Sequence, residues 1–188
     1  MEIIRHPIAG LVGIVPRVFA DARGSFAETY STRNFAEALG DVRFVQDNHS
    51  ISAKRGTVRG LHFQLPDKAQ GKLIRVTRGA IIDVALDLRP KSPTYLQHVA
   101  VELSAANGMQ LYVPRGCAHG FCTLEDETEV LYKTDELYSP EHDRGILWSD
   151  PALGIAWPVT AADAVLSDKD AKAPLLANIP APFPDWGI

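Results

Sequence analysis

The stretch Gly56-Thr-Val-Arg-Gly-Leu-His-Phe-Gln-Leu-Pro-Asp-Lys-Ala-Gln-Gly-Lys72 decides how the rest of the chain is interpreted. Leu61 and Phe63 alternate in it with polar residues, and this period of two predicts a β-strand. The strand is expected to carry His62 and Gln64 together on the face opposite the apolar one.

Three side chains of this stretch have chemistry that suits an enzyme. His62 is a natural general base, because an unperturbed imidazole titrates near neutral pH. Arg59 carries a planar guanidinium group that suits phosphate, and Lys72 carries a compact ammonium charge able to stabilise a developing oxyanion. A surface strand with solvated charges explains the same residues equally well, so the stretch alone leaves both interpretations open.

The composition is that of an ordinary globular protein. The chain has 188 residues, 46% of them hydrophobic, and it suits a single β domain over residues 1–188. The net charge of −4 leaves no broad basic surface for nucleic acid, so an anionic ligand needs a local basic cluster. The opening stretch offers such a cluster.

Nothing in the sequence indicates export or a membrane span. The N-terminus lacks the basic-then-apolar order of a signal peptide, and two aspartates interrupt the apolar run over residues 80–88. Cys117 and Cys122 fit no standard zinc spacing and are expected to be reduced thiols. We therefore expect a cytoplasmic protein with no membrane partner.

Short strands dominate the pattern from residue 72 onward, with Gly, Pro and Asn turns between them. Asp83 and Asp87 are expected on the face of their strand opposite the apolar residues. The apolar positions with period two are Ile82, Val84, Leu86 and Leu88, then Val99, Val101 and Leu103, then Met109, Leu111 and Val113. This succession predicts an all-β fold, an antiparallel sandwich or jelly roll.

The remaining segments predict a hairpin and two helix starts. The turn over residues 21–24 is followed by an alternating run that puts Phe26 and Glu28 on one side, beside Arg23; an exposed hairpin edge is the favoured alternative. Ser31 or Thr32 is expected to cap a short helix that ends at residue 40. A second helix is expected to begin near residue 168.

Two spaced motifs resemble those of the cupins, which are small jelly-roll barrels. Gly108-x5-Pro114-x-Gly116-x2-His119 matches all four fixed positions of their second motif, in which the histidine binds metal. The first motif survives only as Gly56-x5-His62-x-Gln64, without its second histidine and its glutamate. Two histidines and an amide are a poor donor set beside Lys72, so we expect no metal. The alternative for His119 is a core histidine satisfied by backbone.

Many separate stretches, in order along nearly the whole chain, resemble the dTDP-4-dehydrorhamnose 3,5-epimerase family. They are Asp21-x-Arg23-Gly24-x-Phe26, Phe44-Val45-Gln46-Asp47-Asn48-His49-Ser50, Arg59-Gly60-Leu61-His62-Phe63-Gln64, Gln70-Gly71-Lys72, Pro114-x-Gly116-x-Ala118-His119-Gly120-Phe121, Leu131-Tyr132-Lys133, Tyr138-Ser139-Pro140, Ile146-Leu147-Trp148 and Leu166-Ser167-x-Lys169-Asp170. The resemblance implies a cupin-type jelly roll, an antiparallel double-sheet barrel with a few short peripheral helices.

The family inverts C3 and C5 of a dTDP-4-keto-6-deoxy sugar in dTDP-rhamnose synthesis, and the resemblance implies an isomerase without metal or redox cofactor. It makes His62 the base, Asp170 its partner, Tyr132 the acid on the opposite face and Lys72 the group that stabilises the enolate. By local pattern alone, Asp170 is better explained as part of a cap with Ser167, a role that does not exclude the other; the alternative for Tyr132 is a core residue of a β-strand.

The resemblance also implies where the substrate binds. Arg59 and His119 are expected to line the site. The nucleotide end is expected to contact Phe19, Arg23, Phe26, Glu28, Gln46, Asn48 and Tyr138. In the family the N-terminal segment, about residues 1–30 here, crosses to a second subunit, which implies a homodimer.

Three alternatives remain open at this point. Related 5-epimerases and 3-epimerases share most of the site, so the resemblance supports epimerisation of the sugar ketone more firmly than it supports inversion of two centres. A sugar-nucleotide 3,4-ketoisomerase also abstracts a proton within a jelly roll. A non-catalytic cupin that binds a nucleotide sugar or a metal is a third possibility.

Overall fold

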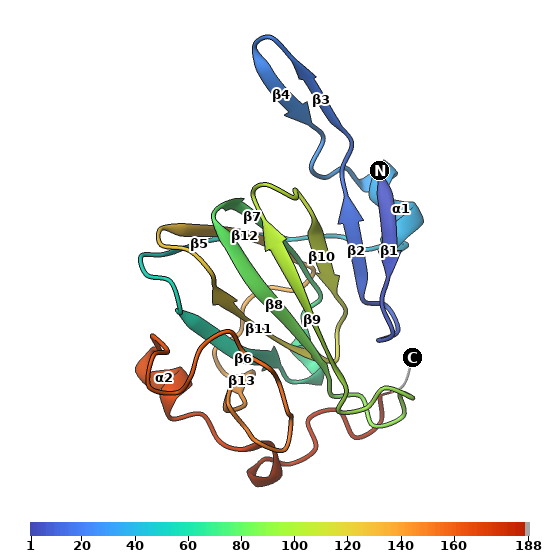
Figure 1. The fold of residues 1–188 in the computed structure, drawn as a ribbon. Helices are drawn as coiled ribbons and strands as arrows, with labels where there is room; N and C mark the ends of the chain where they lie inside the picture. The colour runs from blue at the N-terminus through green and yellow to red at the C-terminus, as the bar shows by residue number, and fades with distance from the viewer. Residues whose placement is uncertain (187–188) are drawn as a thin grey trace.

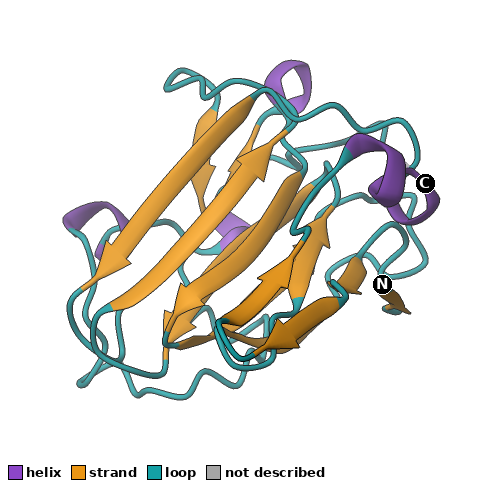
Figure 2. Ribbon diagram, turned by 90° about the horizontal axis from the view of Figure 1, so that it is seen from above, coloured by secondary structure: helices purple, strands orange, loops and turns teal. Residues whose placement is uncertain are grey.

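The computed structural model describes residues 1–186, which form two antiparallel sheets that face each other (Figures 1 and 2). The six-stranded sheet runs in the order β1 (Glu2–Arg5), β2 (Val12–Val15), β10 (Gln110–Val113), β7 (Lys72–Arg78), β12 (Thr128–Thr134) and β5 (Gln46–Ser52). The five-stranded sheet runs in the order β13 (Asp143–Gly145), β6 (Val58–Gln64), β11 (Cys117–Thr123), β8 (Ala80–Asp87) and β9 (His98–Ser104).

The helices are short and peripheral, as expected. α1 (Thr32–Leu39) is capped by Ser31, whose side chain accepts a hydrogen bond from the Asn34 amide, and Gly40 ends it. The others are η1 (Pro66–Lys68), α2 (Asp168–Ala171) and η2 (Leu176–Asn178). This architecture confirms the predicted jelly roll. None of the helices within residues 1–186 has the length and apolarity needed to cross a membrane.

The core fills one part of the space between the two sheets. Ile74 and Val76 from β7 pack there against Ile81 and Ala85 from β8 and Val130 from β12. Because the side-chain period of a strand is two, the neighbouring residues of β8 face outward. There Val84 and Leu86 join a second apolar cluster with the C-terminal segment, including Phe183. β8 is therefore buried on both faces.

The hairpin of β3 (Val18–Asp21) and β4 (Gly24–Ala27) projects from the body of the molecule (Figure 1). Phe19 and Phe26 are cross-strand partners on it, and both rings are largely exposed, Phe26 by 69%. Arg23 pairs with Asp21 at the tip, 2.6 Å between Nη2 and Oδ2. The predicted turn is confirmed, whereas the grouping of Arg23 with Phe26 and Glu28 is not found.

A bulge in β6 is the irregularity that shapes the interior. His62 pairs with His119 of β11, and Arg59 pairs with Phe121, so three steps along β6 match two along β11. Without a bulge, Arg59 and His62 would lie on opposite faces of the strand. The extra residue turns both side chains toward the same side of the sheet.

The bulge also brings two backbones into close contact. An ideal Cβ built on Gly60, whose φ is +120°, would lie 2.6 Å from the Gly120 Cα and 2.7 Å from the His119 carbonyl oxygen. Real Cβ atoms do not approach backbone so closely, so only glycine fits at this crossing.

We expect Gly60→Ala to destabilise the fold by more than about 4 kcal/mol, or to abolish soluble expression, because steric overlap is added to backbone strain. Gly24→Ala is the matched control, since Gly24 has a similar φ of +132° and nothing within 4 Å of its Cβ position. Gly24→Ala should lower the free energy of unfolding by only about 1–3 kcal/mol. Urea unfolding measures both variants, and equal losses would contradict the steric argument.

Candidate active site

A cavity of about 450 Å³ opens between the two sheets, beyond the apolar core. Six of the residues predicted from the sequence line it together: Arg59, His62, Lys72, His119, Tyr132 and Asp170. His62 and His119 come from the five-stranded sheet, whereas Lys72 and Tyr132 come from the six-stranded one. The side chains of His62 and Tyr132 therefore reach the same cavity from opposite walls.

His62 is held by a carboxylate from a distant part of the chain. Its Nε2 lies 2.6 Å from Oδ1 of Asp170, which belongs to α2. Burial favours the protonated form of Asp170, but hydrogen bonds from His62, Ser167 and the Gly60 backbone outweigh it and lower the pKa of this carboxyl. A carboxylate therefore faces the imidazole.

Asp170 also belongs to the helix cap that its sequence pattern predicts. The Ser167 hydroxyl accepts from the Asp170 amide at 3.1 Å and donates to its Oδ2 at 2.8 Å. The cap thus fixes one carboxylate oxygen and leaves Oδ1 for His62. The cap that the local pattern predicts and the contact with His62 that the family resemblance implies are both present.

His119 has a parallel arrangement. It is buried, and its Nε2 lies 2.7 Å from Oδ1 of Asp83, a fully buried residue of β8. The alternative of a core histidine satisfied by backbone is therefore wrong. Asp83 Oδ2 has no hydrogen-bond partner within the described part of the chain.

Burial sets the protonation of the two residues on the opposite wall. It lowers the pKa of Lys72 to about 8, partly offset by the charges of Asp143 and Asp83, while Lys169 lowers it further. Burial raises the pKa of the Tyr132 phenol, although Arg59 acts in the opposite direction. Tyr132 is consequently a neutral proton donor at physiological pH, and Lys72 is mainly cationic.

The cavity is locally basic in a chain of net negative charge. Arg59, Lys72 and Lys169 line it together with Asp170 and the two histidines. Arg59 reaches across to β5, where it donates to the Ser52 hydroxyl and the Ile51 carbonyl, both at 3.3 Å. The arrangement suits an anionic ligand with a carbonyl to be polarised.

A smaller cavity of about 130 Å³ adjoins the first and shares His62, Lys72 and Tyr132 with it. The predicted residues Gln46, Asn48 and Tyr138 line this part. Gln46 Nε2 donates to Asn48 Oδ1 at 2.9 Å. Within residues 1–186, two buried atoms have no hydrogen-bond partner: Nδ2 of Asn48, which lines this cavity, and Oγ of Ser50, which lines the larger one.

Four predicted residues lie apart from both cavities. An open groove of about 560 Å³ at the base of the hairpin is bordered by Phe19, Phe26 and Glu28. Arg23 lies at the tip of the hairpin. Glu28 accepts hydrogen bonds from Ser31 and Asn34 at the start of α1. Within one subunit these residues do not contribute to the site around His62.

Three charged residues of the site were missed by sequence reasoning. Asp83 supports His119, and Asp143 accepts from Lys169 and, at 3.1 Å, from the Tyr138 hydroxyl. Lys169 lies in a stretch that resembles the family, and Asp83 lies on the polar face of a predicted strand, so the sequence offered a reason to consider both residues. Asp143 had none, because its strand β13 has only three residues.

No group of three histidine, cysteine or acidic residues within residues 1–186 is arranged to hold a metal ion. The metal-free site remains a prediction. His62 and His119 each use one ring nitrogen on a carboxylate, and the neighbouring lysine opposes a bound cation.

The chain is similar to known proteins over nearly its whole length. The family profile described as dTDP-4-dehydrorhamnose 3,5-epimerase matches residues 5–178. The chain belongs to this family. A relative of that name from Sinorhizobium fredii is 53% identical over 176 residues, which are 94% of this chain and 90% of the relative.

Two solved structures of the family have the same fold. The Bacillus anthracis dTDP-4-dehydrorhamnose 3,5-epimerase, with TDP and PPi bound, is 52% identical at a TM-score of 0.89, over 93% of this chain and 99% of the other. The Legionella pneumophila dTDP-6-deoxy-D-glucose-3,5-epimerase, in complex with dTDP-4-keto-L-rhamnose, is 42% identical at a TM-score of 0.93, over 100% and 99%. The predicted family, isomerase class and 3,5-epimerase function are confirmed.

Proposed function

We propose that the chain converts dTDP-4-dehydro-6-deoxy-D-glucose to dTDP-4-dehydro-L-rhamnose by inverting C3 and C5 through an enolate. Family membership supports the reaction. One observation carries the mechanism: His62 and Tyr132 line the same cavity from opposing sheets. Inversion needs a base on one face of the sugar and an acid on the other, and these two walls supply them.

His62 removes the proton in the proposed first step. With Nε2–H donated to Asp170, its Nδ1 carries the free lone pair that takes the proton from a carbon next to the C4 carbonyl. The Asp170 carboxylate then stabilises the imidazolium that forms. The electrons of the C–H bond move into the carbonyl, which becomes an enolate.

Lys72 and Tyr132 complete the cycle from the other wall. The charge of Lys72 stabilises the enolate oxygen. Tyr132 returns a proton to the same carbon from the opposite face, and its raised pKa keeps it protonated for this task. After each inversion the His62 imidazolium releases its proton to solvent and the Tyr132 phenolate takes one up, so the same two proton transfers occur at C3 and again at C5. These steps are proton transfers only, so they require neither a metal ion nor a redox cofactor.

The other predicted residues bind the substrate in this proposal. Arg59 and His119 hold the diphosphate and sugar ends near the base. The nucleotide extends into the adjoining cavity with Gln46, Asn48 and Tyr138, where Asn48 Nδ2 lacks a protein partner within the described chain. Tyr138 presents an exposed ring on which the base can stack.

We further propose a homodimer of one-domain chains, residues 1–188, in which segment 1–30 serves the neighbouring site. Two exposed aromatic rings on a projecting hairpin support a partner surface. β5 is an edge strand that carries Gln46 and Asn48, and an unpaired edge accepts further strands. In this arrangement the partner's cavity is completed by four residues of this segment, Phe19, Arg23, Phe26 and Glu28. The free thiols of Cys117 and Cys122 are consistent with a cytoplasmic location.

Proton-exchange NMR in deuterated water tests the reaction. The wild type is expected to incorporate deuterium at both C3 and C5 of dTDP-4-keto-6-deoxyglucose, equally well after treatment with a chelator. His62→Ala should lose exchange at both positions, at least about 10³-fold, because the proposed base is removed. Exchange at one carbon alone would indicate a mono-epimerase, and movement of the carbonyl to C3 would indicate a ketoisomerase.

Tyr132→Phe separates the acid from the base. It removes the hydroxyl but keeps the ring, so wash-out of the substrate proton should continue while net inversion falls by about 10²-fold or more. Time courses of exchange and of epimer formation in the same NMR sample measure the two processes. A parallel loss of both would remove Tyr132 from the role of opposite-face acid.

Subunit complementation tests the shared site. The hairpin variant Arg23→Ala/Phe26→Ala and the variant His62→Ala should each have little activity. Hybrid dimers should regain one complete site, so a fully exchanged equal mixture should reach about a quarter of wild-type activity. A mixture no more active than its components would place the hairpin outside the partner's site.

A further inference from the structure

Gln64 is the residue of the opening stretch that the proposed reaction leaves unexplained. It ends β6, only 3% exposed, at the position of the second histidine in the metal motif. Its amide makes three hydrogen bonds to backbone. Nε2 donates to the Lys68 carbonyl at 2.5 Å and to the Leu137 carbonyl at 3.2 Å, while Oε1 accepts from the Ser139 amide at 2.7 Å.

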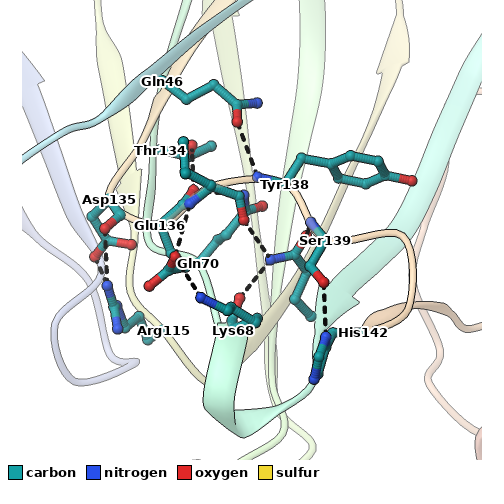
Figure 3. A network of polar contacts seen from close by, with 12 residues as sticks. Gln46, Lys68, Gln70, Arg115, Thr134, Asp135, Glu136, Tyr138, Ser139 and His142 are labelled. Atoms are coloured by element: carbon teal, nitrogen blue, oxygen red, sulfur yellow. Dashed lines mark hydrogen bonds and ion pairs between the residues drawn. The ribbon is translucent and has the colours of Figure 1, made fainter.

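Two of these bonds lie on either side of Tyr138 along the chain. Gln64 donates to the carbonyl of Leu137, which precedes it, and accepts from the amide of Ser139, which follows it. The Tyr138 amide itself donates to Gln46 Oε1 at 2.9 Å (Figure 3). The backbone around Tyr138 is thus fixed by two glutamines, one from each sheet.

The ring of Tyr138 has little other support. It is 54% exposed, and its hydroxyl donates to Asp143 at 3.1 Å. An exposed ring is not positioned by core packing, so its direction depends on the backbone that carries it. The backbone of residues 134–139 is fixed in turn by its neighbours: Gln70 donates to the Glu136 carbonyl at 2.8 Å, and Lys68 pairs with the Glu136 carboxylate at 3.3 Å (Figure 3).

We propose that Gln64 is a positioning residue that pre-organises Tyr138 for the nucleotide end of the substrate. This inference rests on the proposed function, in which Tyr138 contacts the nucleotide. A segment already ordered before binding loses less conformational entropy when the ligand arrives. Gln64 therefore acts on nucleotide affinity, while His62, two residues earlier on the same strand, acts on the chemistry.

Gln64→Met tests this assignment, because methionine has a similar length but makes none of the three bonds. We expect Kd for dTDP and KM for the nucleotide sugar to rise about 3- to 10-fold, with kcat changed less than about twofold. Thr128→Val is the control for a lost buried bond elsewhere, since Thr128 is buried and donates only to the Glu125 carbonyl at 2.9 Å. It should leave both constants unchanged.

A double-mutant cycle distinguishes positioning from general destabilisation. In the Tyr138→Ala background, Gln64→Met should weaken dTDP binding by less than about twofold, because the ring that it positions is gone. If the fold-losses in dTDP affinity of the two single variants multiply in the double variant, the proposal is overturned. It is also overturned if the Gln64→Met variant binds dTDP like the wild type. Gln64→Glu, which keeps the acceptor for Ser139 but sets a carboxylate against two carbonyls, should weaken binding in the same Tyr138-dependent way.

A measurement on the wild type keeps the inference testable even where a variant does not fold. Without ligand, the Ser139 amide should already be protected from hydrogen exchange, and dTDP should add little protection. A freely exchanging Ser139 amide overturns the inference. If the wild type neither exchanges sugar protons nor binds dTDP, the proposed function fails; if it does both and Gln64→Met matches it, only this inference fails.

Discussion

The site depends on the crossing of β6 and β11, where an extra residue in β6 interrupts the alternation of the strand. Arg59 and His62 lie three residues apart and would face opposite ways in a regular strand. The bulge turns both toward one cavity and sets His62 opposite His119. Its structural requirement is a position without a side chain, since the backbones at Gly60 and Gly120 almost touch. The strand β6 thus supplies both side chains for which phosphate binding and proton abstraction are proposed.

Burial of charge on β8 is the second element on which the cavity is built. Asp83 and Asp87 are fully buried on the inward face, and each is matched by a specific partner, His119 for the first and Arg89 for the second. A buried carboxylate is tolerated only when such partners compensate its lost hydration. The Asp83 pair therefore holds a histidine ring on one wall, as Asp170 holds the ring of His62.

Much of this arrangement was predictable from the sequence, because strands, turns and caps are local. The period of two identified β8, and Ser167 predicted the start of α2. What was not predictable depends on distant parts of the chain. The inward direction of Arg59 needs the bulge, and the partner of His62 lies 108 residues away. Only the family resemblance brought these residues together.

The two motifs that resemble those of metal-binding cupins connect these features. His62 and His119 are the histidines of these two motifs, but each binds a carboxylate through one nitrogen, and Lys72 adds positive charge to the same cavity. Such a cavity attracts an anion and an oxyanion-like transition state. Gln64, at the third fixed position of the first motif, likewise uses its polar atoms on groups of the protein. Its polar atoms are turned to the backbone beside Tyr138, so a residue placed to bind metal in related barrels here stabilises the wall of a ligand cavity.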